Sequence, residues 1–142
     1  MSQEEKSNWR DNYFPSNWHR APRLPENMFL TDLDGIEWRK NDNGFLEPRG
    51  FFEYKKMYIF DEIIEQIRTN DRLQWQLHLV GQIAWNYRFK NVYAWFVGYQ
   101  YGDEPETISD IKVFNISLWK KGTDPIVKSM NEWEFMEFLQ NL

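Results

Sequence analysis

The sequence contains no cysteine, an absence that excludes disulfide bonds, thiolate zinc sites and catalysis by cysteine. Histidine is scarce as well: His19 and His78 are the only two, too few for a metal site built from histidines. Any bound metal is therefore expected to be a hard ion with oxygen ligands, Mg²⁺ or Mn²⁺.

Long apolar runs are missing, because no stretch approaches the roughly 20 apolar residues that a membrane-spanning helix needs. Residues 1–11 are polar and charged, and they do not contain the apolar segment of a signal peptide. We therefore expect a cytoplasmic protein without a membrane partner, made by a cell or by a virus that acts inside one.

Positive charge is also in short supply. The 17 Lys and Arg residues are outnumbered by 22 Asp and Glu residues, which leaves a formal net charge of −5. Proteins that bind DNA by broad neutralisation of its phosphates are usually basic. The balance leaves two alternatives: a local basic groove on an acidic protein, or no contact with nucleic acid.

Apolar and aromatic residues are abundant, at 42% and 18% of the sequence, and 142 residues are enough to bury a core. We expect one folded domain over residues 1–142. Residues 1–27 are expected to form an irregular N-terminal arm. Pro15, Pro22 and Pro25 prevent a long helix there. The aromatic and Arg side chains of this arm either contact nucleic acid or pack on the domain.

Hydrophobic periodicity predicts a fold that contains both strands and helices. Residues 28–39 and the segment that ends at Lys55 are predicted strands of a β-hairpin, joined by a turn at 41–44. The remaining predicted elements are helices at 58–68 and 72–87, strands at 92–97 and 111–119, and a closing helix with a capping box at Ser129 and Glu132. This order predicts an α/β fold in which α-helices flank one mixed central β-sheet.

Charged residues occur in the hairpin where packing alone would favour apolar ones. The first strand has an apolar face made by Met28, Leu30, Ile36 and Trp38. Asp32 and Asp34 interrupt this face, and a charged carboxylate is costly to bury unless it is paired or bound to a metal. Glu53 and Lys55 are two residues apart on the second strand, so their side chains project from the same face. We expect the hairpin to gather these acids and the lysine at one end of the sheet.

A cluster of carboxylates beside one ammonium group suits the hydrolysis of phosphodiester bonds. Two carboxylates can hold a divalent ion, which polarises the phosphate and lowers the pKa of a bound water. A lysine can position that water and offset the charge that develops on the phosphorus. The alternative for Glu53 and Lys55 is a surface ion pair, worth about 0–1 kcal/mol.

The segments Thr31–Trp38 and Phe51–Lys55 resemble the core of the PD-(D/E)XK nuclease superfamily. That family places an Asp on one strand and a Glu-x-Lys sequence on the next, followed by a helix. The resemblance extends over residues 28–100 and implies a restriction-endonuclease-like fold with this family's metal-dependent activity.

The resemblance also implies roles for individual residues. Asp34 and Glu53 are expected to bind Mg²⁺ or Mn²⁺ together with the backbone carbonyl of Tyr54. Lys55 is expected to serve the attacking water. Asp32 is the reserve choice for the ligand on the first strand.

The second predicted helix carries a further similarity. Nucleases that resemble the RecB group have a Gln-Leu-x-x-Tyr-like motif in this helix, and its Gln supports the active site. Gln76 and Leu77 match that motif, and Val80 stands where the aromatic residue usually does. Gln76 also lies on the predicted apolar stripe, where a buried amide needs hydrogen-bond partners. The alternative is an ordinary amide at the edge of the core that bonds to the backbone.

We therefore expect a divalent-metal-dependent nuclease that hydrolyses DNA, with RNA left open as a substrate. The alternative is a catalytically inactive domain of the same fold that binds nucleic acid or assembles with proteins. A small nuclease often needs a second copy or a larger partner to engage a duplex, so a homodimer or larger complex is a further expectation. The substrate is expected to meet a basic rim composed of Arg20, Arg23, Lys56, Arg68 and Arg72.

Overall fold

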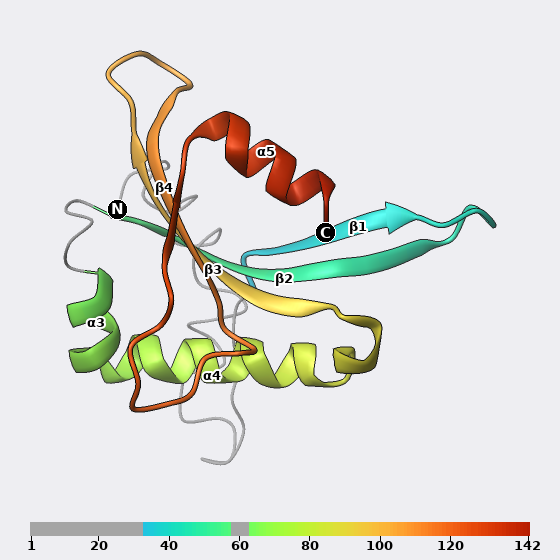
Figure 1. Ribbon diagram of the computed structural model, residues 1–142, viewed down its shortest axis with the longest axis horizontal. Coiled ribbons are helices and arrows are strands. Elements are labelled where there is room, and N and C mark those ends of the chain that lie inside the picture. Colours follow the sequence, from blue (N-terminus) through green and yellow to red (C-terminus); the bar gives the residue numbers. More distant parts are fainter. Residues whose placement is uncertain (1–32, 58–62) are drawn as a thin grey trace, which may run out of the picture. The chain divides into compact units, whose positions relative to one another are not determined.

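The computed structural model describes residues 33–57 and 63–142 (Figure 1). In chain order its elements are β1 (Gly35–Lys40), β2 (Leu46–Lys56), α3 (Ile63–Thr69), α4 (Asp71–Trp85), the short 3₁₀ helix η2 (Arg88–Lys90), β3 (Tyr93–Tyr101), β4 (Ile108–Asn115), β5 (Lys128–Met130) and α5 (Glu132–Gln140). The arm predicted over residues 1–27, with Arg20 and Arg23, lies outside the described residues, and so does Asp32.

The strands form one five-stranded sheet in the order β1-β2-β3-β4-β5. β1 and β2 make an antiparallel hairpin, β3 pairs antiparallel with β4, and β4 pairs antiparallel with β5. β2 and β3 run parallel. Parallel neighbours need a long crossover connection, and this one contains α3 and α4. The predicted α/β class, with a mixed sheet and flanking helices, is confirmed.

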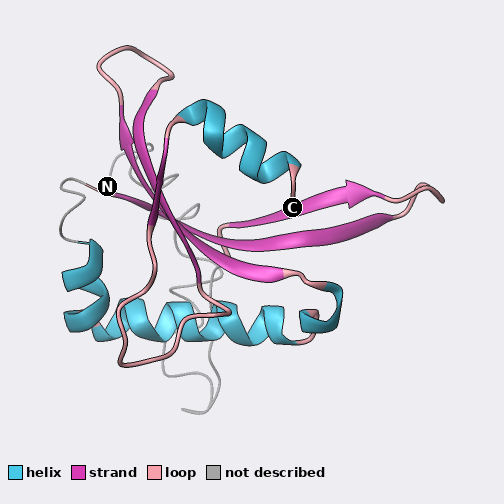
Figure 2. Cartoon of the chain, viewed as in Figure 1, coloured by secondary structure: helices cyan, strands magenta, loops and turns pink. Residues whose placement is uncertain are grey.

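Helices cover both faces of the sheet (Figure 2). On one face, α3 and α4 pack through apolar residues such as Leu77 against Phe51 and Phe96. On the other face, α5 packs through apolar residues such as Phe138 against a second cluster that includes Phe52. Because side chains alternate along a strand, the neighbours Phe51 and Phe52 belong to different layers. Strand β2 is therefore buried from both sides at its centre.

Helix α4 begins where the sequence predicts. The Asn70 side chain accepts a hydrogen bond of 3.1 Å from the backbone N–H of Leu73 and caps the first turn. The predicted apolar stripe is buried and consists of Leu73, Leu77, Val80 and Ala84. In the part of the chain that the structure describes, no helix is both long and apolar enough to cross a membrane.

The first strand differs from the prediction in where it begins among the described residues. Asp34 lies just before β1 and not within it. Glu37 pairs with Gly50 but Trp38 pairs with Pro48, a register shift that inserts an extra residue on β2. The extra residue lies on β2, so alternation along β1 still puts Trp38 on the same face as Ile36, although 46% of Trp38 is exposed.

The closing helix starts at a different cap from the one predicted. The capping box predicted at Ser129 and Glu132 was wrong, because Asn131 caps α5 and exchanges hydrogen bonds of 2.8 and 3.2 Å with Glu134. Ser129 belongs instead to β5, an unpredicted strand of three residues that pairs with β4. So short a strand shows no period of two, and its local pattern does not reveal it.

Replacing Phe96 with Ala should destabilise the protein strongly, because Phe96 is fully buried, at 0% exposure, on the central strand. Removing a buried phenyl group usually costs about 3–5 kcal/mol of unfolding free energy, which urea denaturation measures. Phe45→Ala is the matched control: this residue is 70% exposed, so its loss should change stability by less than about 0.5 kcal/mol. Equal losses in the two variants would contradict this packing.

Candidate functional site

Asp34 lies directly beside the strand that carries Glu53 and Lys55. Its Oδ2 atom accepts a hydrogen bond of 2.9 Å from the backbone N–H of Tyr54. Gly35, the next residue, pairs with the residue that precedes Glu53. The structure therefore brings Asp34 to the level of Glu53 and Tyr54, as the hairpin predicts.

Strand geometry explains this hydrogen bond. β1 stops pairing with β2 at the Gly35–Phe52 pair, so it contributes no ladder beyond that point. The N–H of Tyr54 points to this edge, and the Asp34 carboxylate takes the place of a ladder carbonyl. A hydrogen bond to a carboxylate is stronger than one between neutral groups. The carbonyl of Tyr54 points to the same edge, since both backbone groups of a strand residue face the same neighbouring strand.

Glu53 and Lys55 project from one face of β2. They alternate with Tyr54, and they share a face with Phe51 and Met57, which pack in the core beneath α3 and α4. Both side chains are half-buried. The structure thus places the carboxylate and the ammonium group together, on the side of the sheet that α4 covers.

Gln76 lies on the flank of α4 that faces β2. Positions 76 and 83 lie two turns apart on one side of α4, which ends at Trp85 just before Tyr87. Ile83 and Tyr87 pack against the core, and the ring centre of Tyr87 lies 5.3 Å from that of Phe51. Half-buried Gln76 therefore stands over the same face of β2 as Glu53, where the sequence predicts a supporting amide.

The phenol of Tyr54 is a part of the site that the sequence did not indicate. It projects from the opposite face to Glu53 and stacks on Phe52, with ring centres 5.6 Å apart. Burial raises the pKa of Tyr54 to about 12, and the charges of Glu37 and Asp34 raise it in the same direction. The charge of Asp34, at the edge of the sheet, therefore also affects the Tyr54 phenol on this face.

Tyr99, on the neighbouring strand β3, senses the same carboxylate. A hydrogen bond with Tyr101 and burial raise its pKa, and the charges of Tyr101 and then of Asp34 raise the pKa further. Tyr54 and Tyr99 share a face because Tyr54 pairs with Val97, two residues before Tyr99. The charge of Asp34 thus reaches both Tyr54 and Tyr99 on this face of the sheet.

The cations predicted to form a basic rim are divided between the two faces of the sheet. Arg68 pairs with Asp124, with 2.8 Å between Nε and Oδ1, and this hydrogen bond raises the pKa of Arg68 above its ordinary value. Arg72 is exposed in the first turn of α4. Lys56 lies on the face that α5 covers, with its Nζ 5.1 Å from the centre of the Tyr101 ring. The alternation along β2 separates Lys56 from the other two.

The described part of the site offers a metal ion two carboxylates, those of Asp34 and Glu53. Within residues 33–57 and 63–142, no three His, Cys, Asp or Glu side chains are grouped to hold a metal ion. Asp34 and Glu53 offer two carboxylates, and the reserve ligand Asp32 lies outside the described residues. Mg²⁺ is usually bound through one or two carboxylates, and it keeps several waters and contacts substrate phosphates. The described donors match that habit and do not form a closed cage.

Comparison with models of protein families, with curated proteins and with solved structures gives no match for this chain. The resemblance to the PD-(D/E)XK superfamily therefore depends on the residues of the hairpin and of α4 alone, and the activity it implies stays a prediction. What the site can do follows from its own geometry: a carboxylate at a strand edge, beside a second carboxylate and an ammonium group.

Tyr54 should ionise well above the ordinary pKa of a tyrosine. Its pKa of about 12 lies above the ordinary value of about 10, so the folded state disfavours the phenolate. The stability that this shift contributes is complete below pH 10 and is lost as the pH rises toward 12. Ultraviolet absorbance of phenolate follows the titration, and Tyr54→Phe should remove a step near pH 12. An unchanged curve in this variant would contradict the assignment.

Proposed function

We propose that this chain is a metal-dependent nuclease with a PD-(D/E)XK-type site on a restriction-endonuclease-like fold. The observation that carries the proposal is the 2.9 Å hydrogen bond from the Tyr54 N–H to the Asp34 carboxylate. It joins the Asp of the first strand to the Glu-x-Lys segment of the second strand, which begins at Glu53. The proposed substrate is DNA, and RNA offers the same phosphodiester group.

Asp34 and Glu53 would hold Mg²⁺ or Mn²⁺, together with the backbone carbonyl of Tyr54. Two features of the edge of β2 support this assignment. The Asp34 carboxylate bonds to the N–H of Tyr54 at this edge, and the carbonyl of Tyr54 points out from the same edge. When bound, the ion would polarise the scissile phosphate and lower the pKa of a coordinated water. The two carboxylates would also keep the ion on the α4 side of the strand end, next to Lys55.

Lys55 would orient the attacking water and offset the negative charge that develops at the phosphorus. Its half-buried position supports this role, because a charge with less water around it acts more strongly on its neighbours. Gln76 would be a positioning residue that holds Glu53 and Lys55 through its side-chain amide. Its place on the flank of α4 that faces β2 supports this role.

A second candidate function is that of a catalytically inactive domain with this fold, which binds nucleic acid or assembles with proteins. It is favoured by the absence, among the described residues, of a third acid or histidine grouped with the two carboxylates. The net charge of −5 favours it too, since it opposes broad binding of phosphates. Affinity for a divalent ion separates the two candidates.

Glu53→Gln should abolish most cleavage, because it removes one ligand carboxylate and nearly preserves the shape of the side chain. The substrates are single-stranded, duplex, nicked and branched DNA and single-stranded RNA, with Mg²⁺ or Mn²⁺. Loss of an electrostatic group of this kind usually costs at least about 100-fold in rate, and EDTA should stop the reaction. The cleavage products on a denaturing gel measure the effect.

Glu47→Gln is the matched control, because it makes the same change on the same strand. Glu47 lies roughly 20 Å from Glu53 along β2 and should leave cleavage unchanged. Calorimetric titration with Mn²⁺ gives a readout that does not require substrate. A folded protein that neither cuts nor binds Mn²⁺ would favour the inactive candidate, and cleavage that survives Glu53→Gln would contradict the proposed site.

Asp34→Asn should separate the two tasks of this side chain. The amide oxygen can still accept the hydrogen bond from Tyr54, so the midpoint of urea unfolding should stay close to that of the wild type. Cleavage and Mn²⁺ affinity should fall, because the ligand charge is gone. Asp34→Ala removes the acceptor as well and should cost a further 1 kcal/mol or so, about the net worth of one hydrogen bond. Full activity in Asp34→Asn would point to another ligand.

A further inference from the structure

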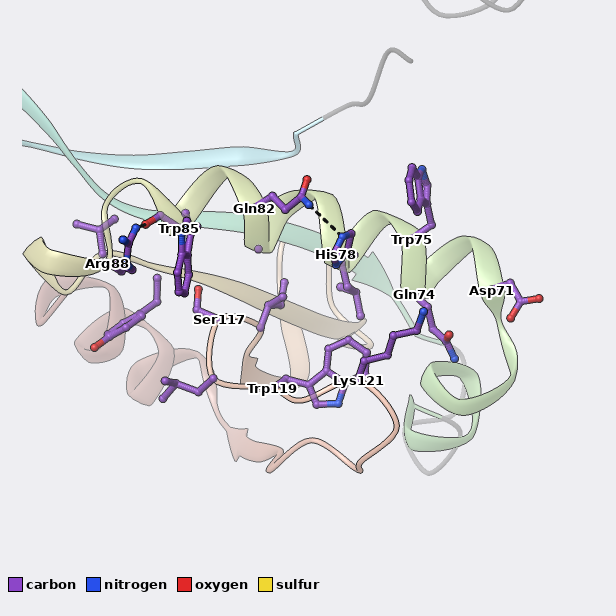
Figure 3. A pocket seen from close by; sticks show the side chains of 17 residues that line it. Asp71, Gln74, Trp75, His78, Gln82, Trp85, Arg88, Ser117, Trp119 and Lys121 are labelled. Atoms are coloured by element: carbon purple, nitrogen blue, oxygen red, sulfur yellow. Dashed lines mark hydrogen bonds between the residues drawn. The ribbon is translucent and has the colours of Figure 1, made fainter. Parts of the chain in front are cut away.

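A groove of about 630 Å³ separates α4 from the segment that follows β4 (Figure 3). Its walls are mainly apolar and aromatic. Trp85 extends from α4 toward the segment, and Trp119 stands on the segment itself. Pockets that bind ligands have volumes of about 300–1,000 Å³, so the groove is large enough for part of one.

The wall that carries Trp119 is preformed. The indole N–H of Trp119 donates a hydrogen bond of 2.8 Å to the carbonyl of Thr123, and its ring lies edge-on to Phe114 with ring centres 6.4 Å apart. The backbone N–H of Ala94 donates a 2.8 Å hydrogen bond to the Oγ atom of Ser117, which ties the segment to β3. An occupant would therefore meet a wall that the fold already holds in place.

The opposite wall, on the side of α4, presents the ring of Trp85 and the guanidinium of Arg88. Trp85 is 62% exposed. The guanidinium of Arg88 lies over its ring, with Cζ 4.1 Å from the ring centre, and donates a 2.8 Å hydrogen bond to the carbonyl of Trp85. Exposure of so large a ring is costly in water, whereas an unpaired base can stack on it and bring a phosphate close to the guanidinium.

The groove is locally positive in an acidic protein. Arg88 and Lys121 line it, and Asp71 is the one acidic residue among the described residues of its walls. The chain as a whole carries a net charge of −5. Two cations and one acid give the groove a charge of +1, the opposite sign to that of the whole chain, so it can attract a phosphate.

The groove lies across α4 from the candidate site. Trp85 lines the groove and Gln76 does not, and nine residues of helix put the two on opposite sides of α4. A helix with its side chains is about 10–12 Å wide. The groove is therefore a separate surface beside the site, and no group in it contributes to the proposed chemistry.

We propose that this groove binds single-stranded nucleic acid, with an unpaired base on Trp85 and phosphates against Arg88 and Lys121. The proposal rests on the proposed nuclease function and narrows its substrate to nucleic acid that has an unpaired strand. Aromatic platforms stack on bases whose faces are open, and the bases of a duplex do not offer theirs. A duplex would meet the cations alone and bind more weakly.

Fluorescence anisotropy of a labelled oligothymidylate tests the proposal, in EDTA so that no cleavage occurs. Trp85→Ala should raise the dissociation constant between about 5- and 150-fold, the usual effect of losing one stacking platform. Trp85→Phe keeps a ring and should lose less. Lys121→Glu should weaken binding and reduce the slope of log K against log salt by about 0.7 for each phosphate that the protein no longer neutralises.

Trp133→Ala and Lys128→Glu are the matched controls. Trp133 is 67% exposed on α5, on the other face of the sheet, and Lys128 is exposed on β5. Both variants should bind as the wild type does. Equal weakening in variants and controls, or no binding by the folded wild type, would overturn the proposal. A dimer that dissociates in Trp85→Ala would overturn it too, because a second copy would then cover the groove.

These measurements distinguish a failure of the groove proposal from a failure of the nuclease proposal. Glu53→Gln should bind the oligothymidylate as tightly as the wild type and yet leave it uncut when Mn²⁺ is added. Binding by the wild type without any cleavage would sustain the groove and refute the nuclease. Cleavage that is unaffected by Trp85→Ala at low substrate concentration would refute the groove alone.

Discussion

Strand β2 has a different neighbour on each of its four sides, and the positions of the other groups depend on it. β1 pairs with one edge and β3 with the other, while α4 and α5 cover opposite faces. Phe51 and Phe52 fill the two layers, so the following residues emerge where the ladder with β1 has ended. Asp34 meets the backbone of Tyr54 at that point. The same arrangement leaves Glu53 and Lys55 half-buried, next to the part of β2 with which β1 no longer pairs.

Elements with strong local signals are predictable from the sequence. The Asn70 cap and the buried stripe of α4 lie within one helix, so their spacing is enough to indicate them. The apolar run of residues 92–97 predicts a strand covered on both faces, and β3 occupies the middle of the sheet. The exposure of Trp38 depends on how far other elements cover its face of the sheet, and the existence of β5 depends on pairing with β4. No local pattern carries that information.

The same division applies to the candidate site. Asp34 and the Glu-x-Lys segment meet because a short turn joins their strands. In this turn the Asn41 side chain accepts two backbone hydrogen bonds, and Gly44 adopts a φ of 80°, which favours glycine. By contrast, Arg68 was assigned to a rim by its charge alone, and its pairing with Asp124 arises from tertiary packing. The raised pKa of Tyr54, whose phenol lies on the other face of β2 from Glu53, also arises from tertiary packing.

The parallel pairing of β2 with β3 bears on the order in which the protein assembles. The β1–β2 hairpin closes a short loop, whereas β2 can meet β3 only after the chain has passed through α3 and α4. Contacts between residues far apart in the chain are slower to form, because more chain entropy is lost first. We therefore expect Asp34 and Tyr54 to come together early in folding, and Gln76 to reach β2 late. In a nascent chain, the hairpin that joins Asp34 to the backbone of Tyr54 would therefore form before the helix that carries Gln76 packs on it.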